Sequence, residues 1–317
     1  MSSPKIAIIG AGMAGITAAR TLVAAGQNVQ LFEKSRGSGG RLASKRSEMG
    51  RINLGAQAFT CDDADFLTEL QLWQQQGWVT QSTHQQSQWT GIPYMSALTR
   101  HLLAQIDTHF ACEIQALSYD SKGWLLHDQH AQTHGPFCQL IVAIPAPQAA
   151  TLLKHCALAL AEQAACVSMQ PAWILALGFK QPLTVTKNLA QLRSSSIAEI
   201  TCTPPSSEHP LQTWRIRASA QWSTLHLEDQ HQHIIAALSK DFAAVLEIES
   251  PVADSVFAHR WRYAIGALPV PTTLLADLQR GLYLTGDWCI CGDVQSAWQS
   301  GQRAALQLLS AAGQQPG

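Results

Sequence analysis

Three glycines and one acid near the N-terminus have the types and the spacing that bind the phosphates and a ribose of a dinucleotide. A short apolar run leads into the turn Gly10-Ala11-Gly12-Met13-Ala14-Gly15, then a helical pattern, then a second apolar run that ends on Glu33. Gly10 permits a tight turn, Gly12 lets backbone N–H groups approach a pyrophosphate, and Gly15 lets helix and strand pack closely. Glu33 is placed to accept hydrogen bonds from a ribose diol. Glycines also mark ordinary turns, but the complete order of strand, turn, helix, strand and acid disfavours that interpretation.

A second glycine-rich turn, which is also basic, follows at once as Lys34-Ser35-Arg36-Gly37-Ser38-Gly39-Gly40-Arg41. A dehydrogenase that binds only NAD would normally enter its next helix at this point. Two consecutive phosphate-binding turns suit a cofactor that is wrapped along its whole length, which favours FAD.

The C-terminal part of the chain carries the other half of the expected site. Thr285-Gly286-Asp287 ends an apolar run, and Asp293 can cap a helix that begins at Val294. An acid just past a strand can bind the polyol linker of FAD. A helix N-terminus near the flavin N1/C2 edge would stabilise the negative charge of the reduced ring. An ordinary capped helix is the alternative, and the N-terminal motif makes it less favoured.

A sheet must position these residues, and the hydrophobic pattern of the chain predicts one. Leu140–Ile144 is a continuous apolar run, typical of a strand buried on both faces. The remaining patterns predict helices at 62–76, 94–104, 148–165, 227–246 and 295–309, and strands at 51–54, 110–117, 124–127, 173–179, 213–220 and 282–285.

The order of these elements predicts an α/β fold with two domains. A Rossmann-type FAD-binding domain is expected from residues 1–60, 98–160 and 271–317. A mainly antiparallel substrate domain is expected from residues 61–97 and 161–270, with the site between the two.

Composition excludes several classes of function. Of 317 residues, 46% are hydrophobic and only 14% charged, with a formal net charge of −1, so nucleic acid and anionic membranes are not expected partners. No apolar segment is long enough to span a bilayer, and no secretion signal is expected. The eight cysteines show no CxxC and no paired metal-ligand spacing, which favours reduced thiols in a cytoplasmic protein and no metal site.

Several motifs together resemble the amine-oxidase-like FAD superfamily. They are Glu33–Arg41, Gly55-Ala56-Gln57, Val142-Ala143-Ile144-Pro145 and Thr285-Gly286-Asp287. Within that superfamily the chain resembles the bacterial renalases, through Ser35–Arg41, Phe137–Pro147, His259-Arg260-Trp261 and Gly286-Asp287-Trp288-Cys289. The matches are spread over nearly the whole chain.

The resemblance implies a fold and an activity. The fold is a Rossmann-type FAD domain with a substrate domain like that of p-hydroxybenzoate hydroxylase. The activity is oxidation of the 2- and 6-dihydro isomers of NAD(P)H to NAD(P)+, with the hydride passing to flavin N5 and dioxygen reduced to hydrogen peroxide. No acid or base of the protein is required, so no catalytic residue is expected.

Positions that match the family's motifs carry expected roles. The residues expected to contact FAD are Gly10, Gly12, Met13, Ala14, Gly15, Glu33, Lys34, Gly40, Arg41, Ala56, Gln57, Ile114, Gly286, Asp287 and Val294. Those expected to border a dihydronicotinamide dinucleotide are Ala58, Phe59, Thr60, Trp288, His259 and Arg262. His259 and Arg262 could equally belong to a structural cluster. Arg215 and Arg217 could meet phosphates, although a solvated strand face is the favoured interpretation.

The chain departs from the family pattern at three places. Ala58 stands where relatives usually have Tyr, Gln295-Ser296 replaces Glu-Gly, and the stretch Val79–Pro93 is short. Two other functions therefore stay open: an amine oxidase or desaturase, and a flavin-binding protein with little catalysis. Cys289 and Cys291 lack the motif for covalent flavin attachment, so noncovalent FAD is expected.

Overall fold

The computed structural model describes residues 5–83, 86–269, 272 and 275–312. The chain divides into two compact units. The first unit comprises Met1–Ala43, Gly55–Ser168 and Gly266–Gly317, and the second comprises Ser44–Leu54 and Met169–Ile265.

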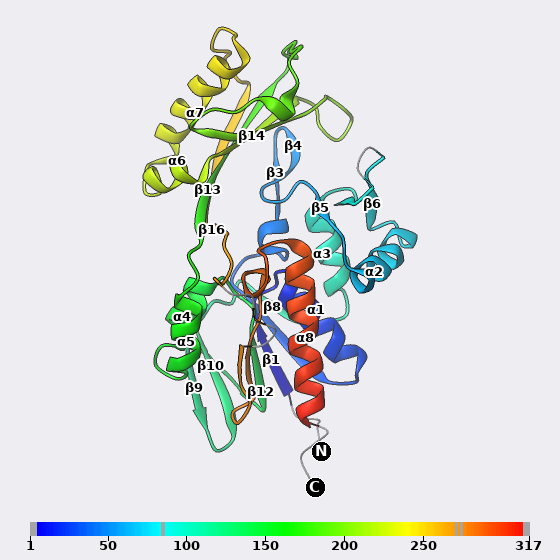
Figure 1. The fold of residues 1–317 in the computed structure, drawn as a ribbon, viewed down its shortest axis with the longest axis vertical. Helices are drawn as coiled ribbons and strands as arrows, with labels where there is room; N and C mark the ends of the chain where they lie inside the picture. The colour runs from blue at the N-terminus through cyan, green and yellow to red at the C-terminus, as the bar shows by residue number, and fades with distance from the viewer. Residues whose placement is uncertain (1–4, 84–85, 270–271, 273–274, 313–317) are drawn as a thin grey trace. The chain divides into compact units, whose positions relative to one another are not determined.

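The first unit is built on a six-stranded sheet in the order β17-β18-β12-β1-β2-β8 (Figure 1). The strands are β1 (Lys5–Ile9), β2 (Asn28–Glu33), β8 (Asp107–Phe110), β12 (Gln139–Val142), β18 (Leu282–Leu284) and β17 (Leu275–Asp277). Every pair is parallel except β17 with β18. With β1 in the middle and the chain leaving it first toward β2 and later toward β12, this is the Rossmann arrangement.

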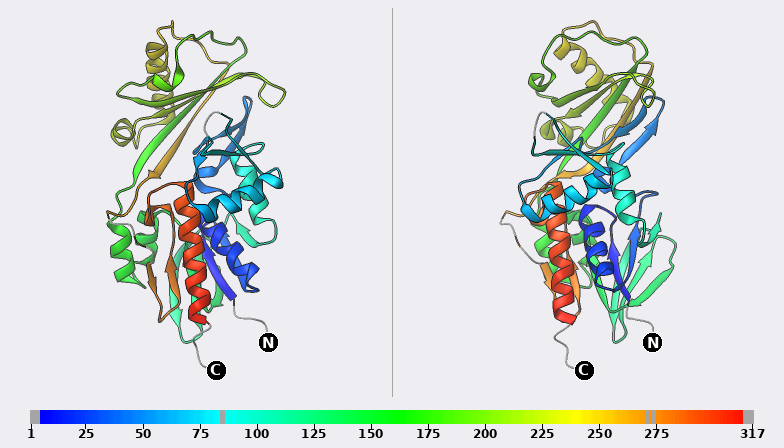
Figure 2. Two further views of the ribbon diagram at one scale, coloured as in Figure 1. Left: turned by 45° about the vertical axis from the view of Figure 1, so that its right-hand side comes forward. Right: turned by 90° about the vertical axis from the view of Figure 1, so that its right-hand side faces the viewer.

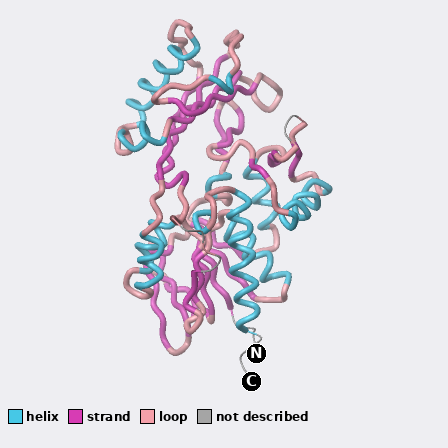
Figure 3. Tube along the Cα trace, viewed as in Figure 1, coloured by secondary structure: helices cyan, strands magenta, loops and turns pink. Residues whose placement is uncertain are grey.

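Two helices cover this sheet where the predicted cofactor residues lie. Helix α1 (Met13–Ala24) packs against helix α8 (Val294–Ala312), although the two are far apart in the sequence. Both views of Figure 2 show the blue α1 and the red α8 near the same strands. Ile6 and Ile8 of β1 and Ile16 of α1 are completely or almost completely buried in the shared core. Figure 3 shows helices flanking the strands of this unit.

The rest of the first unit consists of two small sheets and four helices. A three-stranded sheet has the order β11-β10-β9, and a second has the order β5-β7-β6. Their bounds are β9 (Ile114–Asp120), β10 (Gly123–Asp128), β11 (Thr133–Phe137), β5 (Phe59–Thr60), β6 (Val79–Gln81) and β7 (Gln88–Gly91). The helices are α2 (Ala64–Gln75), α3 (Met95–Leu103), α4 (Ala146–Leu153) and α5 (Leu158–Ala165), with short 3-10 turns η1 (Gly40–Leu42) and η3 (Asp287–Cys289).

The second unit is an antiparallel sheet with the order β14-β15-β13-β16. The strands are β13 (Gln170–Phe179), β14 (Ile197–Thr203), β15 (Gln212–Ala218) and β16 (Ser255–Ile265). Helix α7 (His231–Leu246) covers one face, where Trp214 packs against Phe242. The hairpin of β3 (Ser44–Ser47) and β4 (Gly50–Asn53) packs through Met49 and Ile52 on the other face. The unit also contains α6 (Ala220–Leu225) and η2 (Leu189–Gln191).

The expected fold class is confirmed, and the compact units differ from the expected domain division at four places, including residues 161–168, which belong to the first unit. Residues 61–97 belong to the first unit, since α2 and α3 bury Phe66, Leu70 and Leu98 in its core. Residues 44–54 belong to the second unit, because the β3–β4 hairpin packs on its sheet. The chain returns to the first unit at Gly266, and the expected boundary at 270 and 271 lies outside the described residues.

Two further expectations meet the structure directly. All eight cysteines are free thiols, as their spacing suggested. Among the helices that the structure describes, none has the length and apolar character needed to cross a bilayer.

Candidate functional site

Two of the three motif glycines are fixed by close packing of the turn after β1. Gly10 has a φ of +107°, and a Cβ there would lie 2.5 Å from the carbonyl oxygen of Ala143. A Cβ on Gly15 would lie 2.0 Å from the carbonyl oxygen of Gly10. Neither position accommodates a side chain, so these glycines let α1 and β12 approach the turn as the motif predicts.

Gly12 is free of such packing, and this difference points to a ligand. A Cβ at Gly12 would meet nothing within 4 Å, and its φ of −77° is accessible to any residue. Gly12 is the N-cap of α1, with no side chain capping the helix and no acidic residue in its first turn. A helix N-terminus with open space before its first N–H groups is a ready anion site, and it fits a pyrophosphate.

The second glycine turn lies against the first. The N–H of Gly39 donates to the carbonyl oxygen of Ala11 at 2.8 Å, and a Cβ on Gly40 would lie 3.6 Å from the Cα of Gly12. The structure thus brings the two glycine-rich turns together, as a cofactor wrapped between them requires.

Glu33 is held firmly at the end of β2. It is 8% exposed; its Oε2 accepts a hydrogen bond from the N–H of Ala11 and its Oε1 one from the N–H of Ser35, both at 2.8 Å. A carboxylate offers about four acceptor positions, so two remain for a ribose diol. Ile114, buried at the start of β9, lies near this strand end, since the N–H of Cys112 donates to the carbonyl oxygen of Glu33 at 3.0 Å.

Arg41 connects three of the predicted segments. Its Nη1 donates to Oδ2 of Asp287 at 2.7 Å, and its Nη2 donates to Oδ1, which makes a bidentate ion pair. The N–H of Ala56 donates to the carbonyl oxygen of Arg41 at 3.1 Å, and a Cβ on Gly55 would lie 1.9 Å from the same oxygen. The turns at 39–41, 55–57 and 285–287 therefore meet around one guanidinium.

The C-terminal segment has the predicted cap. Oδ1 of Asp293 accepts the N–H of Ser296 at 2.7 Å, and α8 begins at Val294. The departures at 295 and 296 both have partners: Gln295 Oε1 accepts the N–H groups of Asp62 and Asp63, and Ser296 Oγ accepts the N–H of Cys291. Gln295 thus ties the start of α8 to the chain before α2.

The expected substrate residues of the first unit differ in how exposed their side chains are. Phe59 is 6% exposed and packs on Phe66, so its ring is part of the core of the first unit. Trp288 is 1% exposed and donates from Nε1 to the carbonyl oxygen of Ile144 at 3.1 Å. Thr60 is exposed and Ala58 half-buried, so these two can face a ligand.

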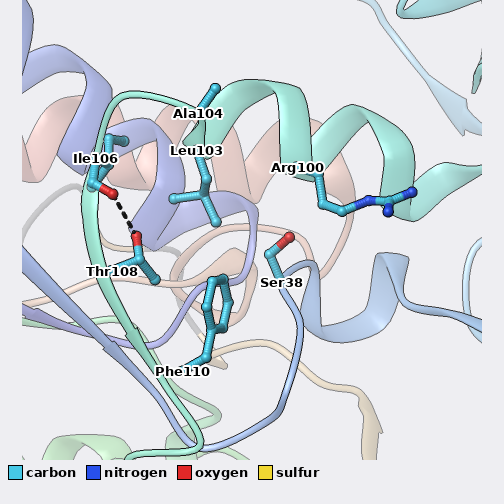
Figure 4. Close-up of a pocket in the computed structure, with 7 residues that line it drawn as sticks. All are labelled: Ser38, Arg100, Leu103, Ala104, Ile106, Thr108 and Phe110. Carbon is cyan, nitrogen blue, oxygen red and sulfur yellow. Dashed lines mark hydrogen bonds between the residues drawn. The ribbon is translucent and has the colours of Figure 1, made fainter.

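A shallow cavity of about 270 Å³ lies beside the second glycine turn (Figure 4). Ser38, Arg100, Leu103, Ala104, Ile106, Thr108 and Phe110 line it, and Figure 4 shows the hydrogen bond from Thr108 Oγ1 to the carbonyl oxygen of Ile106. None of the expected cofactor or substrate residues lines it, although Ser38 belongs to the second glycine turn.

In the second unit, the sheet face opposite α7 gathers cationic and aromatic side chains. Arg215 is only 4% exposed, so the interpretation of its strand face as solvated is wrong for this residue. Its Nη1 lies 3.3 Å from Oε2 of Glu199, which also accepts from Nε of Arg217 at 3.0 Å. The carbonyl oxygen of Leu54 accepts from Nε1 of Trp261 at 3.1 Å.

His259 lies on this face, and Arg262 does not. Strand alternation puts His259 with Trp261, their rings 4.6 Å apart, while Arg262 pairs with Glu228 at 2.6 Å on the other face. Burial, together with the nearby charges of Lys45 and His231, lowers the pKa of His259 to about 4. The expected His-Arg-Trp cluster is therefore divided between two faces.

Spacing alone could not reveal two features of the site. The partners of Arg215 include Glu199 of β14 and the carbonyl oxygen of Leu54, just after β4, and the sequence did not place either segment on this sheet. The N–H of Gly39 donates to the carbonyl oxygen of Ala11 because the second turn folds back onto the first. Glycines permit this fold, but their spacing does not predict it.

Most of the chain matches known protein families. Residues 8–70 match the NAD(P)-binding Rossmann-like domain, and residues 75–309 match the flavin containing amine oxidoreductase family. The chain belongs to the flavin-containing amine oxidoreductase family. As a member of this family it is a flavin-dependent oxidoreductase, and the expected FAD cofactor agrees with the family and with the two glycine turns.

Solved structures confirm the fold. A protein assigned as a protoporphyrinogen oxidase from Exiguobacterium sp. 255-15 superposes with a TM-score of 0.74 at 14% identity, covering 99% of this chain and 100% of that one. Cyclohexylamine oxidase from Brevibacterium oxydans IH-35A gives a TM-score of 0.69 at 11% identity, over 98% of this chain and 100% of that one. A redesigned putrescine oxidase gives 0.68 at 10% identity, over 97% of this chain and 99% of that one.

One curated relative shares a short stretch of sequence. An L-amino-acid oxidase from Demansia vestigiata is 47% identical over 57 residues, which is 17% of this chain and only 11% of that protein's length.

Proposed function

We propose that this chain is an FAD-dependent oxidase that converts the 2- and 6-dihydro isomers of NAD(P)H to NAD(P)+ and reduces dioxygen to hydrogen peroxide. The observation that supports this substrate best is the charge of the second unit's sheet face opposite α7. Lys45, Arg215 and Arg217 lie there with the carboxylate of Glu199. Such a face attracts the phosphates of a dinucleotide and repels a protonated amine.

The residues of the first unit would hold the cofactor. The N–H groups after Gly12 would bind the pyrophosphate, Glu33 the adenosine ribose, and Asp287 with Arg41 the polyol and phosphates. The N-terminus of α8 at Val294 would stabilise negative charge on the ring. Bound FAD supplies hydride acceptance at N5 and passes the two electrons on to dioxygen.

The balance of the reaction explains why no catalytic dyad is needed. A dihydronicotinamide isomer, dioxygen and one proton give NAD(P)+ and hydrogen peroxide. Loss of the hydride leaves an aromatic pyridinium, so no group of the protein must remove a proton from the substrate. The protein's contribution is to orient the nicotinamide and exclude competing reactions.

The flavin is proposed to be noncovalent. Burial raises the pKa of the Cys289 thiol to about 12, so the thiolate needed for a covalent bond does not form at neutral pH. Denaturation followed by ultrafiltration should release all the yellow colour into the filtrate, and flavin retained on the protein would contradict this part of the proposal.

Two arginines on opposite faces of the second unit's sheet test whether the cationic face binds the substrate's phosphates. Arg217→Met should raise the KM for the isomers by about two- to fivefold with little change in kcat, since one screened phosphate attraction is lost. Arg262→Met is the matched control, because Arg262 pairs with Glu228 on the other face. Equal effects of the two variants would contradict the assignment of this face.

An amine oxidase is the second candidate, since the chain's family and two of its structural neighbours are named for amines. Peroxide release separates the two functions. Borohydride-reduced NAD, which contains the isomers, should give peroxide, and a panel of primary and secondary amines should not. Peroxide from the amines alone would establish the second candidate.

A further inference from the structure

Three side chains outside the proposed flavin site converge at one end of the β9-β10-β11 sheet. Cys112 precedes β9, Asp128 ends β10, and His134 lies in β11, all in the first unit. Sγ of Cys112 lies 3.7 Å from Oδ2 of Asp128 and 3.8 Å from Nε2 of His134, and these oxygen and nitrogen atoms are 3.0 Å apart.

The three side chains converge on one point and do not form the ordered chain of nucleophile, base and acid of a catalytic triad. In a relay the carboxylate and the thiol contact opposite nitrogens of the imidazole. Here both face the same nitrogen, Nε2 of His134. For zinc with bonds of about 2.3 Å to sulfur and about 2.0 Å to nitrogen and oxygen, tetrahedral geometry separates the ligand atoms by roughly 3.3–3.6 Å. The three observed separations lie within a few tenths of an ångström of these values.

The surroundings hold the carboxylate in place. Oδ1 of Asp128 accepts the N–H groups of His130 and Gln132, each at 2.9 Å, which leaves Oδ2 directed at the cluster. The side chain of Asp128 is 4% exposed and that of His134 is 20% exposed. A fixed ligand with limited solvent access is typical of a metal site with an ordered outer shell.

We propose that Cys112, Asp128 and His134 form a zinc site, with water as the fourth ligand. Sulfur, imidazole and carboxylate together are a donor set that suits this borderline-soft cation. A thiolate and a carboxylate balance its two positive charges, so the bound cluster is neutral in a partly buried place. The N–H of Cys112 donates to the carbonyl oxygen of Glu33, so the metal links the end of β2 to β10 and β11. The site is independent of the substrate proposed above.

Metal analysis of the full-length holoprotein tests the proposal. The protein is loaded with zinc sulfate, passed over a desalting column and analysed by plasma mass spectrometry. We expect about one zinc per chain, with X-ray absorption showing one sulfur at about 2.3 Å and the remaining ligands nitrogen or oxygen. Cys112→Ser and His134→Gln should each lower the retained zinc at least tenfold, while Cys202→Ser, a half-buried cysteine of the second unit, should leave it unchanged.

Three results would overturn the proposal: wild-type protein that retains no zinc, variants that retain as much as wild type, or an absorption spectrum without a sulfur ligand. The absorption measurement uses wild-type protein, so it decides the question even if a variant fails to fold. Because flavin content is measured on the same samples, loss of zinc with normal flavin is distinguished from general unfolding.

Discussion

Glu33 illustrates how one carboxylate can serve the fold and the cofactor together. Its two oxygens hold the first and second glycine turns through Ala11 and Ser35, on the side where the adenosine ribose is proposed to bind. Its charge lies next to the N-terminus of α1, which favours an anion.

Glu33→Gln should weaken FAD binding by about ten- to hundredfold, since charge-assisted hydrogen bonds contribute about 1.5–3 kcal/mol. Fluorescence of released FAD measures the dissociation constant. Glu162→Gln, an exposed change on α5, is the control and should bind FAD like wild type. Unaltered affinity in the Glu33 variant would show that Glu33 does not contact the cofactor.

His259 makes stability depend on pH in a defined window. Burial lowers its folded-state pKa from 6.5 to about 4, so between these pH values the unfolded chain binds a proton that the folded chain does not. The free energy of unfolding therefore falls as the pH drops from 6.5 to 4, by roughly 2 kcal/mol after its partial solvent contact is discounted, and His259 adds nothing further below 4.

Thermal unfolding of wild type and His259→Asn between pH 4 and 7 checks this. The variant should lose less stability than wild type across the window, whereas His155→Asn, at an exposed position, should follow wild type. Parallel curves for wild type and His259→Asn would refute the assigned pKa.

For individual residues, the sequence predicted which residues meet at the site better than it predicted which way their side chains point. The glycines, Glu33, Arg41 and Asp287 meet as their motif order indicated. Phe59 lies in the core of the first unit, and Arg262 lies on the strand face opposite His259, because the face that a strand residue occupies depends on register with its neighbours. The sequence did not predict the cluster of Cys112, Asp128 and His134, because its members come from three separate segments.

The turn between β1 and α1 contains one glycine that packing requires and one that is proposed to border the cofactor. Gly15 is needed because the turn leaves no room for a methyl group, whereas Gly12 borders open space where the pyrophosphate is proposed to bind. A matched pair of alanine substitutions distinguishes these roles.

Gly12→Ala should leave the unfolding free energy of the flavin-free protein within about 1 kcal/mol of wild type, since its φ suits alanine and no atom lies nearby, yet it should abolish tight FAD binding. Gly15→Ala should destabilise the flavin-free protein itself by about 1–3 kcal/mol or more. Thermal unfolding and FAD titration measure the two effects. Normal FAD affinity in Gly12→Ala would exclude a pyrophosphate at this helix end.

Element positions followed well from hydrophobic periodicity, with instructive exceptions. The buried run 140–144 became β12, and the patterns at 62–76 and 94–104 became α2 and α3. The single helix expected over 148–165 is two, α4 and α5, because the chain leaves helical geometry at Ala157, whose ψ is 66°. Apolar periodicity continues across this break, so the pattern does not predict it.

At the scale of the whole molecule, the chain assembles its Rossmann unit from three separated segments. The C-terminal strand β18 pairs with β12, and α8 packs on α1, so both halves of the proposed flavin site depend on the chain's two ends folding together. The motif order predicted this architecture. It did not predict that the β3–β4 hairpin joins the second unit, because that depends on packing of Met49 and Ile52 on a distant sheet.

In the proposed reaction, the enzyme takes a hydride from misplaced-hydride isomers of NAD(P)H. The most direct measurement is the anaerobic absorbance spectrum of the flavin after mixing with purified 2-dihydro, 6-dihydro or 4-dihydro NAD(P)H. We predict rapid bleaching by the 2- and 6-dihydro forms, far slower bleaching by the 4-dihydro form, and return of the oxidised spectrum with peroxide when air is admitted. Bleaching that is equally fast with the 4-dihydro form, or absent with all three, would contradict the proposal.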